Sequence, residues 1–336
     1  MAKVNVFITI DTEHSIGGAF ADPTLRPVGN DKRVYGKVNG REYGIPLIMD
    51  IADRFNIPLT FFVEVFNKYH FGEAETRDVC QYILGRGHDV QLHLHPNFLN
   101  FREERPSDCK YSDNLSTYDL ATQIELIGEG KELLTRYCGH SPIVFRAGNY
   151  GANANTLKAL KANGIFIDSS YNAAFPRHSQ RICEQQFNDA DQLEGVWEFP
   201  ITNFVEAIPL RGKRFKPLDL NGVGFAEMRR VLEQAHSCQG PRNITFIMHS
   251  FSFLKAGDVQ YQKCSVRQYV VERFSQLCCH LAEHGETFRC LRFRDIAMLE
   301  REFESLDASH VYPSVSFGYS LKRLVQQQLY EVRPRK

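Results

Sequence analysis

Short runs of apolar and β-branched residues alternate along the chain with longer segments in which apolar residues recur every three or four positions. The short runs predict buried strands and the longer segments predict amphipathic helices. Strands are expected at 4–10, 59–63, 89–94, 143–145, 165–167, 196–199 and 244–248, with an eighth near 288–292. Helices are expected at 48–55, 76–84, 120–137, 155–163, 225–236 and 266–284. This alternation is typical of an α/β fold built on a parallel sheet.

Two segments do not follow the alternation. Residues 14–45 are rich in Gly, Pro and Asp and are too long for an ordinary turn, so they are either a loop that covers a substrate or a surface excursion. The last segment has apolar residues at helical spacing and ends in Arg333, Arg335 and Lys336. We expect residues 1–300 to form one barrel domain and residues 301–336 a helical extension packed on it. Contact of this basic end with a membrane surface is an open alternative.

The composition limits the kinds of binding partner and the cellular location that we expect. Lys and Arg together number 40, as do Asp and Glu, so the charge balance does not favour nucleic acid as a partner. The chain enters its first expected strand without a signal-peptide pattern, and no apolar run approaches the roughly 18 residues needed to cross a bilayer. The nine cysteines are scattered, as in reduced proteins. We therefore expect a cytoplasmic protein with no transmembrane segment, whose membrane association, if any, is peripheral.

A pair of histidines at the end of the third expected strand indicates a metal site. Alternate side chains of a strand share a face, so His93 and His95 project together, and Pro96 stops the strand just after them. Asp11 and Glu13, at the end of the first strand, form a second pair on one face. Two imidazoles and a carboxylate suit Zn²⁺, Fe²⁺ or a similar divalent ion. We predict Glu13, His93 and His95 as the metal ligands.

Other expected strands also end in reactive residues. Arg146, Asp168 and His249 each close an apolar run. In a barrel of parallel strands these ends form one rim, where barrel enzymes place their chemistry. Asp11 is then free to act as a general base that Arg146 holds ionised. His249 would act as the general acid, with Asp168 fixing its tautomer.

The order of these motifs resembles the polysaccharide deacetylase family, whose members contain a NodB-homology domain and act as carbohydrate esterases. The resemblance rests on five stretches, at 9–13, 87–96, 146–151, 168–170 and 247–249. It implies a distorted (β/α)7 barrel and metal-dependent removal of an acetyl group from an N-acetylated sugar, with Zn²⁺ as the first choice of metal. It also implies that the backbone N–H of Tyr150 stabilises the oxyanion.

Two features depart from the usual pattern of this family. Asp-Thr-Glu stands where adjacent aspartates are usual, and the histidine spacing is two residues in place of four. The shorter spacing leaves open whether His95 binds the metal directly. The pattern is closest to the deacetylases of lipopolysaccharide and capsule biosynthesis, whose substrates would be nucleotide-linked, lipid-linked or glycan intermediates.

Three other functions remain possible on the sequence alone. An amidohydrolase that cuts a non-sugar C–N bond would use the same residues. A non-haem Fe(II) oxygenase also uses two histidines and a carboxylate, but it would not need a base, an orienting arginine and an acid. A catalytically impaired member that binds sugar would tolerate the altered histidine spacing.

Overall fold

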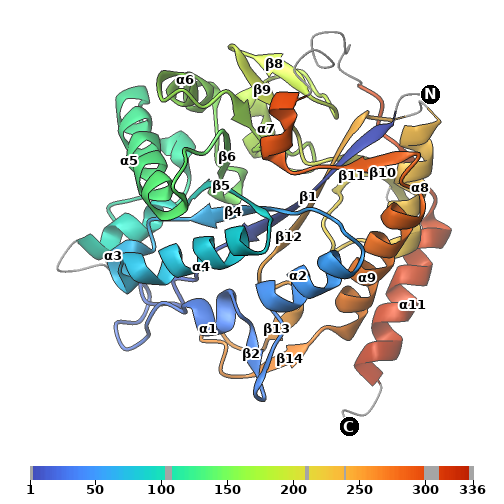
Figure 1. Ribbon diagram of the computed structural model, residues 1–336, viewed down its shortest axis with the longest axis horizontal. Helices are drawn as coiled ribbons and strands as arrows, with labels where there is room; N and C mark the ends of the chain where they lie inside the picture. The colour runs from blue at the N-terminus through green and yellow to red at the C-terminus, as the bar shows by residue number, and fades with distance from the viewer. Residues whose placement is uncertain (1–2, 103–107, 209–211, 238–239, 299–309, 333–336) are drawn as a thin grey trace.

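A computed structural model of the chain describes residues 3–102, 108–208, 212–237, 240–298 and 310–332. Its main sheet has nine strands: β1 (Val4–Thr12), β4 (Thr60–Glu64), β5 (Asp89–Leu94), β6 (Val144–Ala147), β7 (Ile167–Asp168), β8 (Asp191–Leu193), β9 (Val196–Glu198), β12 (Asn243–His249) and β15 (Phe288–Cys290). They follow the order β12-β1-β4-β5-β6-β7-β9-β8, with β15 beside β1 (Figure 1). All neighbours are parallel except β8 and β9. The curled parallel sheet confirms the predicted α/β fold of distorted-barrel type.

Strand β1 lies in the middle of the structure. All nine of its residues are buried, because one face points into the barrel and the other lies beneath helices. Its partners set the rim of the barrel: Asp11 lies opposite His249 on β12 and opposite Phe62 on β4. Further around the sheet, His93 on β5 lies opposite Arg146 on β6. Register in the sheet therefore brings together residues that are far apart in the chain.

Helices stand around the outside of the curled sheet (Figure 1). The main ones are α2 (Ile45–Arg54), α4 (Glu73–Gly85), α5 (Leu120–Cys138), α6 (Ala154–Ala162), α8 (Phe225–His236) and α9 (Gln268–Glu283). Their ends follow local chemistry: Asp119 caps α5 by accepting from the Thr122 N–H at 2.8 Å, and Gly139 ends it with a φ of 76°. Each predicted helix is present, with small shifts at its ends.

Two short irregular stretches, one at Thr202 and one at 218–220, lie along the free edge of β12. The Thr202 N–H donates to the Thr245 carbonyl at 3.1 Å, and the Leu218 N–H donates to the Thr202 carbonyl at 2.8 Å. The N–H groups of Ile247 and Leu220 then donate to the carbonyls of Leu218 and Ile247, at 3.0 and 3.1 Å. These bonds give partners to backbone N–H and carbonyl groups on the free edge of β12. In a closed barrel a neighbouring strand would bond to the same groups.

Smaller elements decorate the rim and the periphery. They are α1 (Asn30–Arg33), β2 (Lys37–Val38), β3 (Arg41–Glu42), α3 (Lys68–Phe71), α7 (Pro176–Ile182), β10 (Asn203–Ile208), β11 (Gly212–Pro217), β13 (Leu254–Ala256), β14 (Cys264–Val266), β16 (Ser314–Val315) and α11 (Phe317–Val332), together with the 3₁₀ helices η1 (Pro96–Arg102), η3 (Leu115–Thr117), η4 (Gly148–Tyr150) and η5 (Phe293–Met298). The segment 14–45, predicted as a loop, therefore carries a short helix and the β2–β3 hairpin.

The predicted boundary between the barrel and its extension falls within residues 299–309, outside the described residues, and the division stays a prediction. Helix α11 contacts α8, α9 and β10 and stands at the outer edge of the molecule (Figure 1). None of the helices in the described ranges combines the length and apolar character that a bilayer span requires.

Candidate active site

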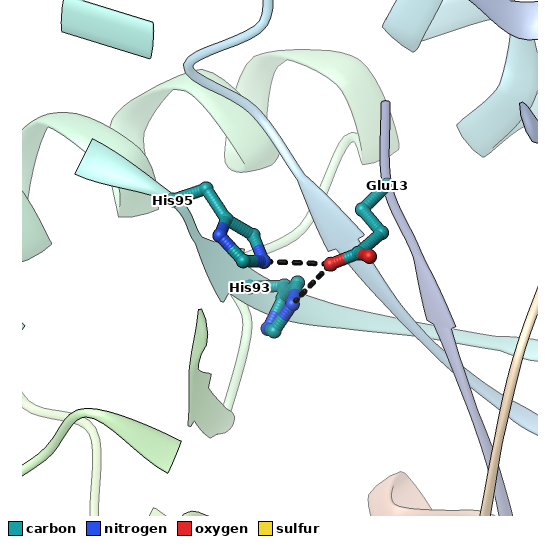
Figure 2. Close-up of side chains that lie close together, drawn as sticks. All are labelled: Glu13, His93 and His95. Carbon is teal, nitrogen blue, oxygen red and sulfur yellow. Dashed lines mark hydrogen bonds and ion pairs between the residues drawn. The ribbon is translucent and has the colours of Figure 1, made fainter. Parts of the chain in front are cut away.

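Glu13, His93 and His95 lie together at the carboxyl ends of β1 and β5 (Figure 2). One carboxylate oxygen of Glu13 is 2.6 Å from His95 Nε2 and 3.5 Å from His93 Nε2. One ligand atom from each residue lies within 4.8 Å of the others, and in the described part of the chain no other group of at least three His, Cys, Asp or Glu residues meets this criterion. These three residues could hold a metal ion.

The orientation of His93 supports this interpretation. Its Nδ1 is 2.8 Å from the Arg146 carbonyl, which can only accept, so Nδ1 carries the proton and Nε2 carries the lone pair. That Nε2 is buried and has no hydrogen-bond partner among the described residues. A buried nitrogen lone pair that faces a carboxylate and a second imidazole fits a divalent metal, whose binding would satisfy it.

Asp113 orients His95 from the opposite side. Its Oδ1 is 2.9 Å from His95 Nδ1, while its Oδ2 accepts from Asn149 at 2.6 Å. Burial lowers the pKa of His95, but the charges of Asp113 and Glu13 outweigh burial, and the pKa lies well above its usual range. The next turn makes room for the ring, because a Cβ on Gly148 would stand only 2.6 Å from it. A carboxylate behind a histidine is the usual support of a metal ligand.

Arg33 holds the other oxygen of Glu13. Its Nη2 donates to Glu13 Oε1 at 2.8 Å, and its guanidinium lies 3.3 Å from the centre of the Phe251 ring. Arg33 also donates to the hydroxyl of Tyr261, and its carbonyl accepts from Ser250 at 2.7 Å. The segment 14–45 therefore contributes Arg33 to the site, and Oε2 of Glu13 is the oxygen that faces the histidines.

Asp11 and Arg146 form a buried ion pair next to this cluster. Arg146 Nη1 donates to Asp11 Oδ1 at 2.7 Å and to the Thr9 hydroxyl at 2.9 Å. Its other nitrogens donate to the carbonyl and the hydroxyl of Ser169, at 3.0 and 2.9 Å. Arg146 thus lies where the sequence predicted it, and its bonds orient Asp11.

His249 is close to Asp219, not to Asp168. Burial raises the pKa of Asp219, and the nearby His249 opposes that shift. Asp168 instead accepts from the Ser169 N–H at 2.9 Å and from the Ser170 hydroxyl at 2.6 Å. The partnership predicted between Asp168 and His249 is therefore corrected: β7 and β12 are separated in the sheet by four strands, and Asp219 occupies the neighbouring position.

Asp168 is paired with a second acid, Glu198. Both side chains are fully buried, and the structure places them opposite each other on β7 and β9. Burial raises the pKa of both, and for Glu198 the charge of Asp168 adds to this, so that its pKa lies well above the usual range. Two adjacent carboxyl groups in a dry site share one proton, since both cannot ionise at low cost.

The candidate metal ligands, Asp11 and His249 surround one cavity of about 320 Å³. Asp11, Glu13, His93, His95 and His249 line it, together with Ala147, Asn149, Tyr150, Phe175 and His178. The volume suits a small ligand or one unit of a larger one. Arg146 lies beneath the cavity and contacts it through Asp11, while the predicted Tyr150 lines it directly.

Four neighbours of the site were not predicted from the sequence. Asp113, Asp219 and His178 belong to no motif, and Arg33 lies in a segment that gave no strand or helix pattern. His178 Nδ1 is buried without a partner among the described residues, and the Phe175 ring packs 5.2 Å from that of Tyr150. No spacing rule links these residues to the histidine motif, because each reaches the site through the folded chain alone.

No family model and no curated protein matches this sequence. Several solved structures share the fold. A candidate polysaccharide deacetylase from Mycobacterium smegmatis aligns with a TM-score of 0.58 and 16% identity, covering 94% of this chain and 96% of that one. The allantoinase PuuE gives 0.53 and 14%, covering 91% and 93%. A candidate polysaccharide deacetylase from Pseudomonas aeruginosa PAO1 gives 0.50 and 14%, with the same coverage.

The chain is thus structurally similar to polysaccharide deacetylases and to an allantoinase. At these identities the similarity concerns the fold alone. It does not distinguish the lipopolysaccharide and capsule subgroup, which stays a prediction.

We expect the purified protein to bind one divalent metal ion per chain, which metal analysis after loading with Zn²⁺ will measure. His93→Ala and Glu13→Gln should each abolish stoichiometric binding, because each removes one of three ligands. His310→Ala, an exposed histidine outside the site, is the matched control and should keep the full content. Full occupancy in His93→Ala would refute the assignment.

Asp113→Ala should weaken metal binding by about 10–100-fold without abolishing it, because the imidazole of His95 would lose the acceptor that orients it. Competition with a chelator measures the affinity. His95→Ala tests the ligand itself: if His95→Ala and Asp113→Ala bind metal as tightly as the parent, His95 is not a ligand.

Glu198→Gln should make stability less dependent on pH. The raised pKa of Glu198 means that the folded state keeps a proton that the unfolded state releases above its ordinary pKa of 4.5. The free energy of unfolding should therefore fall as pH rises from that value, by up to about 1.4 kcal/mol per pH unit. The amide introduced by Glu198→Gln supplies the bridging N–H without titrating. Urea unfolding at several pH values measures the difference, and the exposed Glu194→Gln is the control. Parallel pH profiles for parent and Glu198→Gln would contradict the shared proton.

Proposed function

We propose that the protein is a metal-dependent hydrolase that removes the acetyl group from an N-acetylated sugar, with Zn²⁺ as its metal. The observation that carries the proposal is the arrangement in one cavity of an Asp11 carboxylate, held by Arg146 at 2.7 Å, beside three potential metal ligands and opposite His249. A base, an acid and a metal-binding group around one small cavity are the parts that amide hydrolysis requires.

Glu13, His93 and His95 would hold the metal through Oε2 and the two Nε2 atoms. A divalent ion bound there lowers the pKa of a water molecule and polarises an acyl oxygen. Two protein side chains would complete its surroundings: Asp113 keeps the proton of His95 on Nδ1, and Arg33 keeps Glu13 turned so that one oxygen faces the site.

Asp11 would take the proton of the attacking water. Arg146 donates to Oδ1, so the second oxygen would play this role. The backbone N–H of Tyr150 would donate to the oxyanion that forms when the carbonyl carbon becomes tetrahedral. His249, which lines the same cavity from the strand next to Asp11, would protonate the departing nitrogen so that acetate and a free amino sugar leave. Asp219, which lies beside β12 near His249, would help to orient that histidine.

The substrate that we propose is a nucleotide-linked, lipid-linked or glycan intermediate of surface polysaccharide biosynthesis, such as that of lipopolysaccharide. The cytoplasmic location expected from the sequence is part of this proposal. The shared fold with polysaccharide deacetylases is consistent with it, and the shared fold with allantoinase keeps an amidohydrolase acting on a non-sugar C–N bond as the alternative.

Acetate release from a panel of nucleotide-linked N-acetyl sugars will test the activity in the Zn²⁺-loaded protein. Asp11→Asn should lower kcat by at least about a hundredfold while metal content is unchanged, because it removes the base and keeps the ligands. His249→Gln should lower kcat similarly. Lys158→Gln, which lies on the outer helix α6, is the control and should leave kcat unchanged.

Three results would contradict parts of this proposal. Hydrolysis of allantoin with no acetate release from any sugar would select the amidohydrolase alternative. Loss of metal in Asp11→Asn would exchange the roles of Asp11 and Glu13. Stoichiometric metal with no turnover on either class of substrate would favour a sugar-binding protein.

A further inference from the structure

Helix α11 is oriented against the usual rule for a surface helix. Three of its inward positions, spaced every three residues, are polar: Ser320 is buried, Arg323 is nearly so, and Gln326 accepts from Arg273 at 3.0 Å. The aromatic residues Tyr319 and Tyr330 also pack against the rest of the protein. Among its exposed positions, Leu321, Leu324, Val325 and Leu329 are apolar and are 50%, 44%, 51% and 61% exposed. The polar residues Lys322 and Gln328 are exposed beside them. A surface helix normally buries its apolar stripe and exposes its polar one.

The inward polar face is held by a network of ion pairs. Arg323 Nε is 3.0 Å from Glu227 on α8, and Nη2 is 3.4 Å from Glu206 on β10. The Ser320 hydroxyl lies within hydrogen-bond distance of the same two carboxylates, 3.0 Å from Glu227 and 2.5 Å from Glu206, and its one proton is shared between them. Turning the helix to bury its leucines would take Arg323 and Ser320 away from these buried acids, which is costly even though Arg214, Lys216 and the Gly224 N–H would remain as partners. The orientation therefore follows from the packing, and the apolar stripe is left outside.

The stripe runs from Leu321 to Leu329, about 12 Å of helix. The helix that carries it stands at the outer edge of the molecule (Figure 1). Exposed apolar side chains that stand singly need no explanation, but a contiguous stripe marks a surface that something covers. The helix is one of the described helices that cannot span a bilayer, so a membrane could meet it only from the side.

The charges of this segment favour an anionic surface over a second copy of the chain. From residue 321 onward the sequence has five cations, Lys322, Arg323, Arg333, Arg335 and Lys336, and the single acid Glu331. Pairing two copies in antiparallel fashion would bring Lys322 towards the partner's basic end, and parallel pairing would bring the two basic ends together. Arg323 faces inward and is paired with Glu227 and Glu206, so the cations available to a partner are Lys322 and the three basic residues that follow the helix in sequence. An anionic bilayer complements these, since clustered Lys and Arg next to an apolar face attract acidic lipid headgroups.

We propose that α11 is a peripheral membrane-binding helix, which lies in the interface of a bilayer rich in anionic lipid with Leu321, Leu324, Val325 and Leu329 in the acyl region. The basic residues after the helix add electrostatic attraction to the headgroups. The barrel would thereby be held at the membrane surface by an element that takes no part in the cavity. This inference is independent of the reaction that the cavity performs.

Cosedimentation of the full chain with lipid vesicles tests the proposal. We expect binding to vesicles that contain about one third phosphatidylglycerol, little binding to pure phosphatidylcholine, and weaker binding at raised salt. The double variant Leu324→Ser/Val325→Ser should lower partitioning by at least about tenfold, since two apolar side chains no longer leave water. The triple variant Arg333→Ser/Arg335→Ser/Lys336→Ser should lower it only at low salt.

Val259→Ser is the matched control, because Val259 is 60% exposed on the turn between β13 and β14 and should leave binding unchanged. Circular dichroism and the stoichiometry of bound metal will show that each variant is folded. Failure of the folded parent to bind anionic vesicles, or equal binding by parent and Leu324→Ser/Val325→Ser, would overturn the proposal. Concentration-dependent dimerisation that Leu324→Ser/Val325→Ser abolishes, without vesicle binding, would overturn it and assign the stripe to a second copy.

Discussion

A buried guanidinium that crosses the barrel interior is the constraint on which the site depends. Arg146 is fully buried, extends from β6 towards β1, and rests 4.0 Å from the centre of the Phe62 ring. A buried cation is tolerated only when its donors are satisfied, and Arg146 uses Asp11, Thr9 and Ser169 for this purpose. Because these partners come from β1 and from the residue after β7, the charge fixes three parts of the barrel relative to one another.

Arg146 also connects the proposed general base with the candidate metal ligands. Its side chain orients Asp11, and its backbone carbonyl sets the tautomer of His93 at 2.8 Å. Asp168 and Glu198 lie behind it and lower its electrostatic cost. A proton shared by these two acids keeps the net charge around the guanidinium small, which explains why a pair of carboxyl groups is accommodated in a fully buried position.

A second chain of polar contacts runs along the rim. It passes from Asn149 through Asp113 to His95, and from His95 through Glu13 to Arg33. Each contact fixes the donor or acceptor role of the next, so the ligand atoms are oriented before any metal binds. The short spacing between the two histidines is accommodated because His95 lies just after β5 ends, where the 3₁₀ turn η1 begins, and because Gly148 leaves space for its ring.

The sequence by itself determined the alternation of strands and helices, the strand ends that carry Asp11, His93, Arg146 and His249, and the pairing of histidines with a carboxylate. These features follow from side-chain periodicity and from residue chemistry, both of which are local. The tertiary structure alone decided which distant residues meet. In the structure Asp219, and not the predicted Asp168, lies near His249. Asp113 and Arg33 contact the candidate ligands, and the leucines of α11 face outward. These outcomes depend on strand register and on the need of buried charges for partners. Neither can be predicted from the residue spacing within one segment.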